Sequence, residues 1–342
     1  MYHIKDYSLT RTMSDKTPIK DTVFLLRSIK SGYSMHNVFL PIINFMHAPY
    51  YEAPCERADI KSLMTNLKWV RKVASTKGIN HMTGGYHYLL LAIPFQKNVL
   101  TIHDLVLLRN SKGLKRFIFK LLWFKLPIMC SKMVTCITNT TRQELLSAIH
   151  MNPQKAVTVY NPVSPLYQYT EHLFNKSCPR ILHIGTAWNK NTENVIASLK
   201  GITCKIVIVG ELSDSISAAL RDCNIQHEIL HDLSNEELYQ QYQLADIISF
   251  PSIYEGFGMP IIEGQATGRP VLTSNIPPMT EVAGNGACFV NPRDIDSMRK
   301  GFLRIINDDE YRNQLVREGI ENAKRFALGT IVEQYHRIYE KL

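Results

Sequence analysis

The chain has 342 residues, 45% of them hydrophobic. A chain of this length exceeds the usual size of a single hydrophobic core and is long enough for two domains of about 150 residues each. Seven cysteines without a C-x-x-C pair, and no hydrophobic signal peptide at the start, favour a reducing cytoplasm over the disulfide-rich secreted class. The longest apolar stretch, 117–130, contains two lysines and is shorter than the roughly 20 apolar residues of a spanning helix, so we expect no membrane crossing.

The formal charge of +9 is divided unevenly along the chain. Residues 1–165 hold 22 Lys and Arg against 8 Asp and Glu, a balance of +14. Residues 166–342 hold 17 against 22, a balance of −5, and the two balances sum to +9. We therefore expect the N-terminal half to bind an anionic partner, either a membrane surface or a polyanion, and the C-terminal half to have a separate role.

The first half alternates between short β-rich runs and helix-like patterns. Residues 1–20 are polar and aperiodic and are predicted to be a flexible extension. Strands are expected at 22–26, 99–103 and 133–138. The alternation predicts a parallel sheet with crossover helices, in a first domain over 21–163. The irregular stretch 164–178 is predicted to link it to a second domain.

The second half, 179–326, shows a cleaner α/β pattern. Ser234 and Glu237 form the S-x-x-E pattern of a capping box that opens a helix, and Pro260 occupies a first helical turn. A last helix over 327–342 is expected to pack back across the domain junction. Buried strands are expected at 181–185, 205–210, 247–250, 271–274 and 288–290.

The strongest chemical signal is the run E-G-F-G-M-P-I-I-E from Glu255 to Glu263, directly after an expected strand. Gly256 and Gly258 let backbone N–H groups approach a ligand, and the helix start that follows favours an anionic phosphate or a sugar hydroxyl. One carboxylate can then face a sugar while the other accepts hydrogen bonds from ribose hydroxyls. The alternative is that Glu255 caps a helix and Glu263 lies on the surface.

The sequence around this run resembles a known enzyme family. Residues 250–271 and the E-V-A-G segment at 281–284 are similar, nearly residue for residue, to the donor-binding segment of the family 4 (group 1) glycosyltransferases. The resemblance implies an α/β GT-B fold, in which two Rossmann-like, doubly wound domains face each other across a cleft and the C-terminal helix crosses back. It also implies a catalytic role for Glu255 and donor contacts by Gly256, Phe257, Gly258, Met259, Pro260 and Glu263.

The resemblance continues upstream at Gly185, Thr186 and Lys190, which look like the family's glycine turn and its basic residue. Lys190 would bind the donor and stabilise the leaving nucleotide diphosphate, because a preorganised cation stabilises charge that develops in the transition state. Many family members also carry an arginine in this turn, which is absent here, so Arg27 or Arg142 is a candidate substitute. For Lys190 alone, a solvated lysine at a helix start is the alternative.

The first domain resembles the family's acceptor domain more loosely. His103 follows an expected strand and would face the cleft, where a neutral imidazole can orient a hydroxyl or move a proton. The alternative is a structural histidine paired with Asp104 or with backbone. Gly32, His81 and Arg142 are candidates for the acceptor side, although His81 also fits a structural role.

Retention of anomeric configuration is implied by the family, and a front-face attack assisted by the donor phosphate is the expected mechanism.

Asp294-Ile295-Asp296 is a literal D-x-D, the carboxylate pattern that holds a metal in other glycosyltransferases. Its place before a helical run instead fits Asp294 as an N-cap and Asp296 as a first-turn acid. We therefore expect no metal and no cofactor, with the nucleotide sugar as a substrate.

Residues 105–143 contain no acidic residue and eight basic ones. Basic residues at helical spacing, interleaved with aromatic ones, predict a helix in the headgroup region of an anionic membrane over 109–132. The alternative is that the aromatic residues are core and the lysines a solvated face. The basic residues are Arg109, Lys112, Lys115, Arg116, Lys120, Lys125, Lys132 and Arg142.

These observations predict a cytoplasmic enzyme, peripheral at the inner face of the cytoplasmic membrane. It would transfer a sugar from a nucleotide sugar to a lipid-linked or saccharide acceptor of a bacterial surface polysaccharide. The alternatives are a nucleotide-sugar epimerase, a phosphorylase and a catalytically weak sensor of nucleotide sugars. Nucleic acid is not an expected partner because the chain has no nucleic-acid-binding motif. An NAD-dependent dehydrogenase is also not expected, because no G-x-G-x-x-G follows the first strand of either domain.

Overall fold

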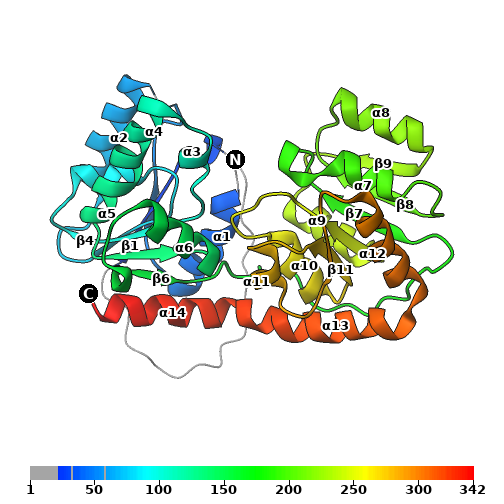
Figure 1. Cartoon of the computed structure of the whole chain (residues 1–342). Helices are drawn as coiled ribbons and strands as arrows, with labels where there is room; N and C mark the ends of the chain where they lie inside the picture. The colour runs from blue at the N-terminus through cyan, green and yellow to red at the C-terminus, as the bar shows by residue number, and fades with distance from the viewer. Residues whose placement is uncertain (1–21, 32–33, 58) are drawn as a thin grey trace.

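The structure is a computed structural model that describes residues 22–31, 34–57 and 59–342. Within these residues it contains two sheets of six strands, each wholly parallel, in two domains that lie side by side (Figure 1). The α/β fold with two doubly wound domains is therefore confirmed. The expected extension at 1–20 and the candidate residue Gly32 lie outside the described residues.

The first sheet has the strand order β2-β1-β3-β4-β5-β6. Its strands are β1 (Thr22–Leu26), β2 (Tyr50–Glu52), β3 (Ile79–Met82), β4 (Lys97–Ile102), β5 (Met133–Cys136) and β6 (Ala156–Thr158). Its helices are α1 (Ser34–Met46), α2 (Ile60–Val73), α3 (Val106–Arg109), α4 (Gly113–Phe119), α5 (Leu126–Met129) and α6 (Asn139–Ala148), with a π-helical turn at Lys120–Lys125. The central strands are buried because helices cover both faces of a parallel sheet.

The second sheet has the order β12-β11-β10-β7-β8-β9. Its strands are β7 (Arg180–Ile184), β8 (Lys205–Val209), β9 (Gln226–Leu230), β10 (Ile247–Phe250), β11 (Val271–Ser274) and β12 (Cys288–Val290). Its helices are α7 (Thr192–Ser198), α8 (Asp214–Cys223), α9 (Asn235–Leu244), α10 (Met259–Thr267), α11 (Met279–Ala283), α12 (Ile295–Asn307) and α13 (Asp309–Ala323). The chain order reverses between β7 and β10, and ligands of such sheets bind in the crevice beyond the strand ends at this point.

Several local predictions are confirmed by hydrogen bonds. Ser234 and Glu237 form both halves of the capping box at the start of α9. Pro260 lies in the first turn of α10. Four strands escaped prediction, namely β2, β3, β6 and β9. Three are short, with three or four residues, and β9 (QHEIL) is only partly buried, so hydrophobic periodicity marks them weakly.

The C-terminal helix α14 (Leu328–Glu340) crosses from the second domain to the first, as the fold prediction required. Figure 1 shows α13 and α14 running along one side of both domains. Ile331 and Tyr335 of α14 are buried against the first sheet and α1. The Tyr339 hydroxyl lies 2.5 Å from His81 Nδ1, and Thr101 Oγ1 lies 2.7 Å from His81 Nε2. Burial lowers the pKa of His81 to about 3, so the imidazole is neutral.

Candidate active site

The two domains meet backbone to backbone at the glycine loop that follows β10. A Cβ atom at Gly256 would lie 2.5 Å from the carbonyl oxygen of His103, at the end of β4. Thr138 Oγ1 also donates a weak hydrogen bond, of 3.4 Å, to the Gly256 carbonyl. The predicted donor loop of the second domain therefore touches the carboxyl edge of the first sheet, and only glycine fits there.

A half-buried ion pair lies beside this contact. Lys190 Nζ is 2.7 Å from Glu255 Oε1, with side-chain exposures of 22% and 14%. Asn189 Nδ2 donates to the same carboxylate oxygen at 3.1 Å and to the Tyr254 carbonyl at 2.9 Å. The Gly258 position, not Glu255, precedes α10, and no side chain caps this helix. The structure thus joins two predicted catalytic residues in one preorganised pair.

The glycine turn after β7 carries Lys190 into the crevice. Gly185 has φ +92°, and a Cβ atom there would lie 3.0 Å from the aliphatic chain of Lys190. The Lys190 ammonium lies 4.8 Å from the centre of the Phe250 ring, at the end of β10. Thr186 packs against Gly210, where a Cβ atom would be 2.8 Å from its hydroxyl. The cation is therefore held between the carboxyl ends of β7 and β10, where a phosphate is expected to bind.

His103 faces this region from the first domain. Its Nε2 lies 2.7 Å from the Thr83 carbonyl oxygen, and burial lowers the pKa of the imidazole. A neutral ring must donate from Nε2 to a carbonyl, which leaves Nδ1 as an acceptor. The carboxylate of the neighbouring Asp104 accepts a hydrogen bond from the Val106 N–H at 2.9 Å.

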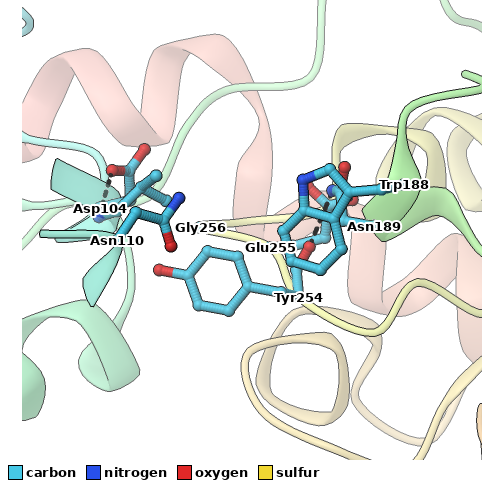
Figure 2. Close-up of a pocket in the computed structure, with 8 residues that line it drawn as sticks. Asp104, Asn110, Trp188, Asn189, Tyr254, Glu255 and Gly256 are labelled. Atoms are coloured by element: carbon cyan, nitrogen blue, oxygen red, sulfur yellow. Dashed lines mark hydrogen bonds between the residues drawn. The ribbon is translucent and has the colours of Figure 1, made fainter.

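A cavity of about 230 Å³ lies between the domains beside these residues. Figure 2 shows Asp104 and Asn110 of the first domain on one side and Trp188, Tyr254 and Glu255 of the second on the other. Arg109 belongs to the basic segment 109–132, yet its guanidinium lies 4.5 Å from the centre of the Tyr254 ring, which belongs to the second domain. The cavity is lined by Asp104, Val106, Asn110, Trp188, Asn189, Tyr254, Glu255 and Gly256.

Five of these lining residues had no predicted role: Val106, Asn110, Trp188, Asn189 and Tyr254. Asp104 had been considered only as a partner of His103. Trp188 and Asn189 lie within the glycine turn between Gly185 and Lys190, which was the available sequence signal. These two residues occupy the turn that lacks the family's arginine.

Other predicted site residues lie outside the cavity. Phe257 is 4% exposed and packs edge-on against Phe326. Glu263, in the second turn of α10, accepts a 2.5 Å hydrogen bond from the Tyr242 hydroxyl. Met259 and Pro260 form the first turn of α10, and their donor contacts stay predictions.

The acceptor-side candidates that the structure describes, His81 and Arg142, also do not line the cavity. His81 is fully buried beneath α14. Arg142 donates from Nε to the Ala156 carbonyl at 2.7 Å and from a terminal nitrogen to the Pro153 carbonyl at 3.1 Å. This engagement also removes Arg142 as a substitute for the missing arginine. Arg27 instead lies against Gly85 at the carboxyl edge of the first sheet, where a Cβ atom would be 3.3 Å from its Cδ.

Glu281 of α11 fastens the second domain to the first. Its two carboxylate oxygens accept hydrogen bonds from the Asn139 and Thr140 N–H groups, at 2.6 and 3.0 Å, at the start of α6. The hydroxyls of Thr140 and Tyr160 donate to it as well, at 2.9 and 3.1 Å. A carboxylate at a helix N-terminus is favourably placed, so this contact stabilises the observed arrangement of the domains.

The D-x-D pattern forms a helix cap. Asp294 Oδ1 accepts hydrogen bonds from the N–H groups of Asp296 and Ser297, at 3.0 and 3.1 Å, at the start of α12. The N-cap prediction is therefore confirmed. Across the described ranges, no cluster of three or more His, Cys, Asp or Glu side chains is arranged to hold a metal ion.

The basic segment of the first domain is divided between core and surface. Residues 112–118 are all exposed, including Leu114 at 73% and Phe117 at 62%. Phe124 is buried at 1%, and Phe119 and Trp123 pack against the core. The surface that remains available for the predicted membrane contact is therefore limited to residues 112–118, in and next to α4. None of the described helices combines the length and apolar composition that a membrane crossing requires.

Glu263 gives the fold a pH dependence. Burial raises its pKa to about 7, above the 4.5 of an exposed glutamate, so the native state holds a proton that the unfolded chain releases. Its contribution to the free energy of unfolding is fully present below pH 4.5 and is lost as the pH rises to about 7, and it amounts to about 3 kcal/mol. Glu263→Gln should flatten this part of the profile in urea unfolding at pH 5 and 7.5, whereas exposed Glu310→Gln should not. An unchanged profile in Glu263→Gln would contradict the assignment.

Comparison with known proteins places this geometry in context. Residues 170–322 match the family model described as glycosyl transferases group 1. The O-antigen chain mannosyltransferase RfbU of Salmonella typhimurium is 26% identical over 255 residues, which cover 70% of this chain and 71% of that protein. The O-antigen chain mannosyltransferase B of Escherichia coli is 33% identical over 108 residues, covering 32% of this chain and 28% of that protein.

Solved structures share the whole architecture. Anabaena Alr3699/HepE, crystallised with UDP and glucose, superposes with a TM-score of 0.77 at 13% identity, covering 94% of this chain and all of that one. WaaG, described as a glycosyltransferase involved in lipopolysaccharide biosynthesis, superposes with a TM-score of 0.68 at 12% identity, covering 93% and 99% of the two chains. At such identities, the likeness concerns the fold alone.

Proposed function

We propose that this chain, which has the GT-B fold and matches the group 1 glycosyltransferases over residues 170–322, transfers a hexose from a nucleotide sugar to a saccharide acceptor of a bacterial surface polysaccharide. The observation that carries this proposal is the Lys190–Glu255 pair, held at the strand-order reversal of the second sheet beside the cavity between the domains. Two relatives are named O-antigen chain mannosyltransferases, so a nucleotide-activated mannose is the first donor to test.

The donor would lie along the carboxyl ends of the second sheet. Its diphosphate would occupy the crevice between β7 and β10, next to Lys190 Nζ and the N-terminus of α10. Lys190 would stabilise the charge that develops on the leaving diphosphate, and Glu255 would hold the ammonium in position. HepE, a protein of the same fold, was crystallised with UDP, which supports a nucleotide ligand for this chain.

The chemistry would proceed with retention and without a metal. Lys190 supplies a fixed cation for the leaving group, the task that a divalent metal performs in other transferases. The acceptor hydroxyl would attack from the face that the diphosphate leaves, and the phosphate oxygen would take its proton. His103, neutral and with Nδ1 free to accept, would orient a hydroxyl nearby. Inverted anomeric configuration in the product, read by NMR, would refute this mechanism.

Calorimetry of the purified chain with UDP-, GDP-, ADP- and CMP-sugars, with and without EDTA, tests the proposal. One donor should bind at micromolar strength regardless of the chelator, and turnover of that donor should persist in EDTA. Failure of every nucleotide sugar to bind would refute the function. Tight binding without turnover on any acceptor would favour a catalytically weak sensor instead. Turnover that EDTA abolishes and magnesium restores would refute metal independence.

We also propose that the first domain meets an anionic membrane at the inner face of the cytoplasmic membrane, where lipid-linked acceptors would be presented. Support comes from α4, which has no buried residue and combines Leu114 and Phe117 with Lys115 and Arg116. Exposed apolar side chains flanked by cations are typical of helices that lie in the headgroup region.

Leu114→Ser together with Phe117→Ser is expected to reduce flotation with anionic liposomes at least several-fold, because both the apolar contact and the depth of the cations are lost. The matched control is Leu173→Ser, which changes a leucine that is 93% exposed on the linker. It should float like the unaltered chain. Equal flotation with neutral and anionic liposomes would reject the membrane proposal.

A further inference from the structure

The cavity between the domains has the chemical lining of a saccharide site. Charged side chains on its wall are the carboxylates of Asp104 and Glu255, and Asn110 and Asn189 add amides. Carboxylates and amides are the groups that accept and donate hydrogen bonds to sugar hydroxyls. Its volume of about 230 Å³ lies below the roughly 300–1,000 Å³ of sites for larger ligands, which suits one ring rather than a whole nucleotide sugar.

Trp188 is the most distinctive residue on this wall. Its side chain is 70% exposed, although indole is among the largest apolar groups in proteins. The other two tryptophans, Trp69 and Trp123, pack against the core of the first domain. An indole left uncovered in a cavity with polar walls offers a flat apolar face, and such residues commonly anchor ligands.

The charge of the cavity wall disfavours a phosphate. Lys190 pairs with Glu255 and, in the proposed reaction, also serves the donor diphosphate, while Arg109 lies over the Tyr254 ring. With the donor bound, a phosphate-bearing acceptor end would therefore face the Asp104 carboxylate and the donor diphosphate. Like charges brought together at a binding surface lower affinity, whereas neutral hydroxyls complement both groups.

We propose that this cavity is an acceptor subsite for one neutral hexose ring, the terminal sugar of a saccharide chain, with Trp188 as its stacking platform. This inference rests on the proposed transfer reaction. Asp104 and Asn110 hold hydroxyls of that ring, so that one hydroxyl oxygen attacks the anomeric carbon of the donor. The new glycosidic bond forms as the bond from that carbon to the phosphate oxygen breaks, and the departing diphosphate takes the hydroxyl proton. The enzyme thus extends a saccharide rather than glycosylating a lipid phosphate.

Acceptor kinetics of the full chain test this assignment, with the donor identified by calorimetry held at saturation. The probes are neutral octyl hexosides and the corresponding hexose 1-phosphates. Trp188→Ala should raise KM for octyl hexosides about tenfold, the loss expected when roughly 50–60 Å² of apolar contact disappears, with donor KM unchanged. Trp188→Phe should restore most of the affinity. Phe95→Ala, at a phenylalanine that is 96% exposed outside the cavity, serves as the matched control and should leave KM unchanged.

The phosphate comparison supplies an independent readout. Hexose 1-phosphates should show kcat/KM values at least about tenfold below those of the octyl hexosides, and Asp104→Asn should narrow that gap. Octyl hexosides should also change the tryptophan fluorescence of the unaltered chain and not that of Trp188→Phe. Equal or better use of the phosphates, or an unchanged acceptor KM in Trp188→Ala, would overturn the assignment. So would a donor-binding enzyme that shows neither turnover nor a fluorescence response, whereas absence of donor binding would refute the proposed function itself.

Discussion

Lys190→Ala is expected to lower kcat and kcat/KM together by about 10²–10³-fold. The ammonium is held by Glu255 at 2.7 Å and by the Gly185 turn beneath its aliphatic chain, so its position is fixed before the donor arrives. A cation placed in advance does not need to reorganise as charge develops on the diphosphate. Its contribution therefore belongs to the transition state, and donor binding should weaken less than turnover.

Glu255→Ala should cause a loss of similar size because the pair acts as a unit, and the double variant should be little worse than either single one. Lys205→Ala is the matched control, since Lys205 forms a 2.7 Å ion pair with Glu228 in the same domain but away from the cavity. Steady-state kinetics with a saturating acceptor would measure all four variants. Near-normal kcat in Lys190→Ala, or additive losses in the double variant, would remove the pair from the mechanism.

Ile331→Ala is expected to lower the free energy of unfolding by about 2–5 kcal/mol, the usual cost of emptying a buried isoleucine site. Ile331 is fully buried where α14 packs on the first sheet. The helix contributes Val332, Tyr335 and Tyr339 to the same core cluster. The first domain therefore depends for part of its core on the last residues of the chain.

Ile295→Ala is the matched control, because Ile295 is 41% exposed at the start of α12 and the same substitution there should cost less than about 0.5 kcal/mol. Urea unfolding followed by circular dichroism would measure both variants. Equal stability of the two would show that α14 rests on the first domain without supporting it.

The sequence predicted those parts of the molecule that depend on local pattern. Buried apolar runs such as 247–250 and 271–274 became central strands, and the capping box at Ser234 formed as expected. Glu255 and Lys190, which lie 65 positions apart in the chain, are brought together because each follows a strand at the reversal of a doubly wound sheet. That consequence of topology is available before any coordinates.

Features that depend on how elements pack could not be predicted in this way. Glu263 meets Tyr242 because α9 lies beside α10, and no spacing along the chain encodes that contact. Phe117 and Phe124 belong to one aromatic run, yet Phe117 in α4 faces solvent and Phe124, in the π-helical turn Lys120–Lys125, faces the core, so a single helical period does not describe the run. Trp188 lines a cavity whose opposite wall belongs to the other domain, so its place in a site could not be predicted from its own segment of the sequence.

The contact at Gly256 also sets the spacing between the two halves of the reaction centre. Here the domains touch through main-chain atoms, with no side chain between Gly256 and the His103 carbonyl. Side chains change rotamer, whereas main-chain atoms of ordered loops move little, so this contact fixes the distance between the two loops closely. The separation of the donor and acceptor sides of the cleft in this arrangement therefore depends on main-chain packing at a single glycine.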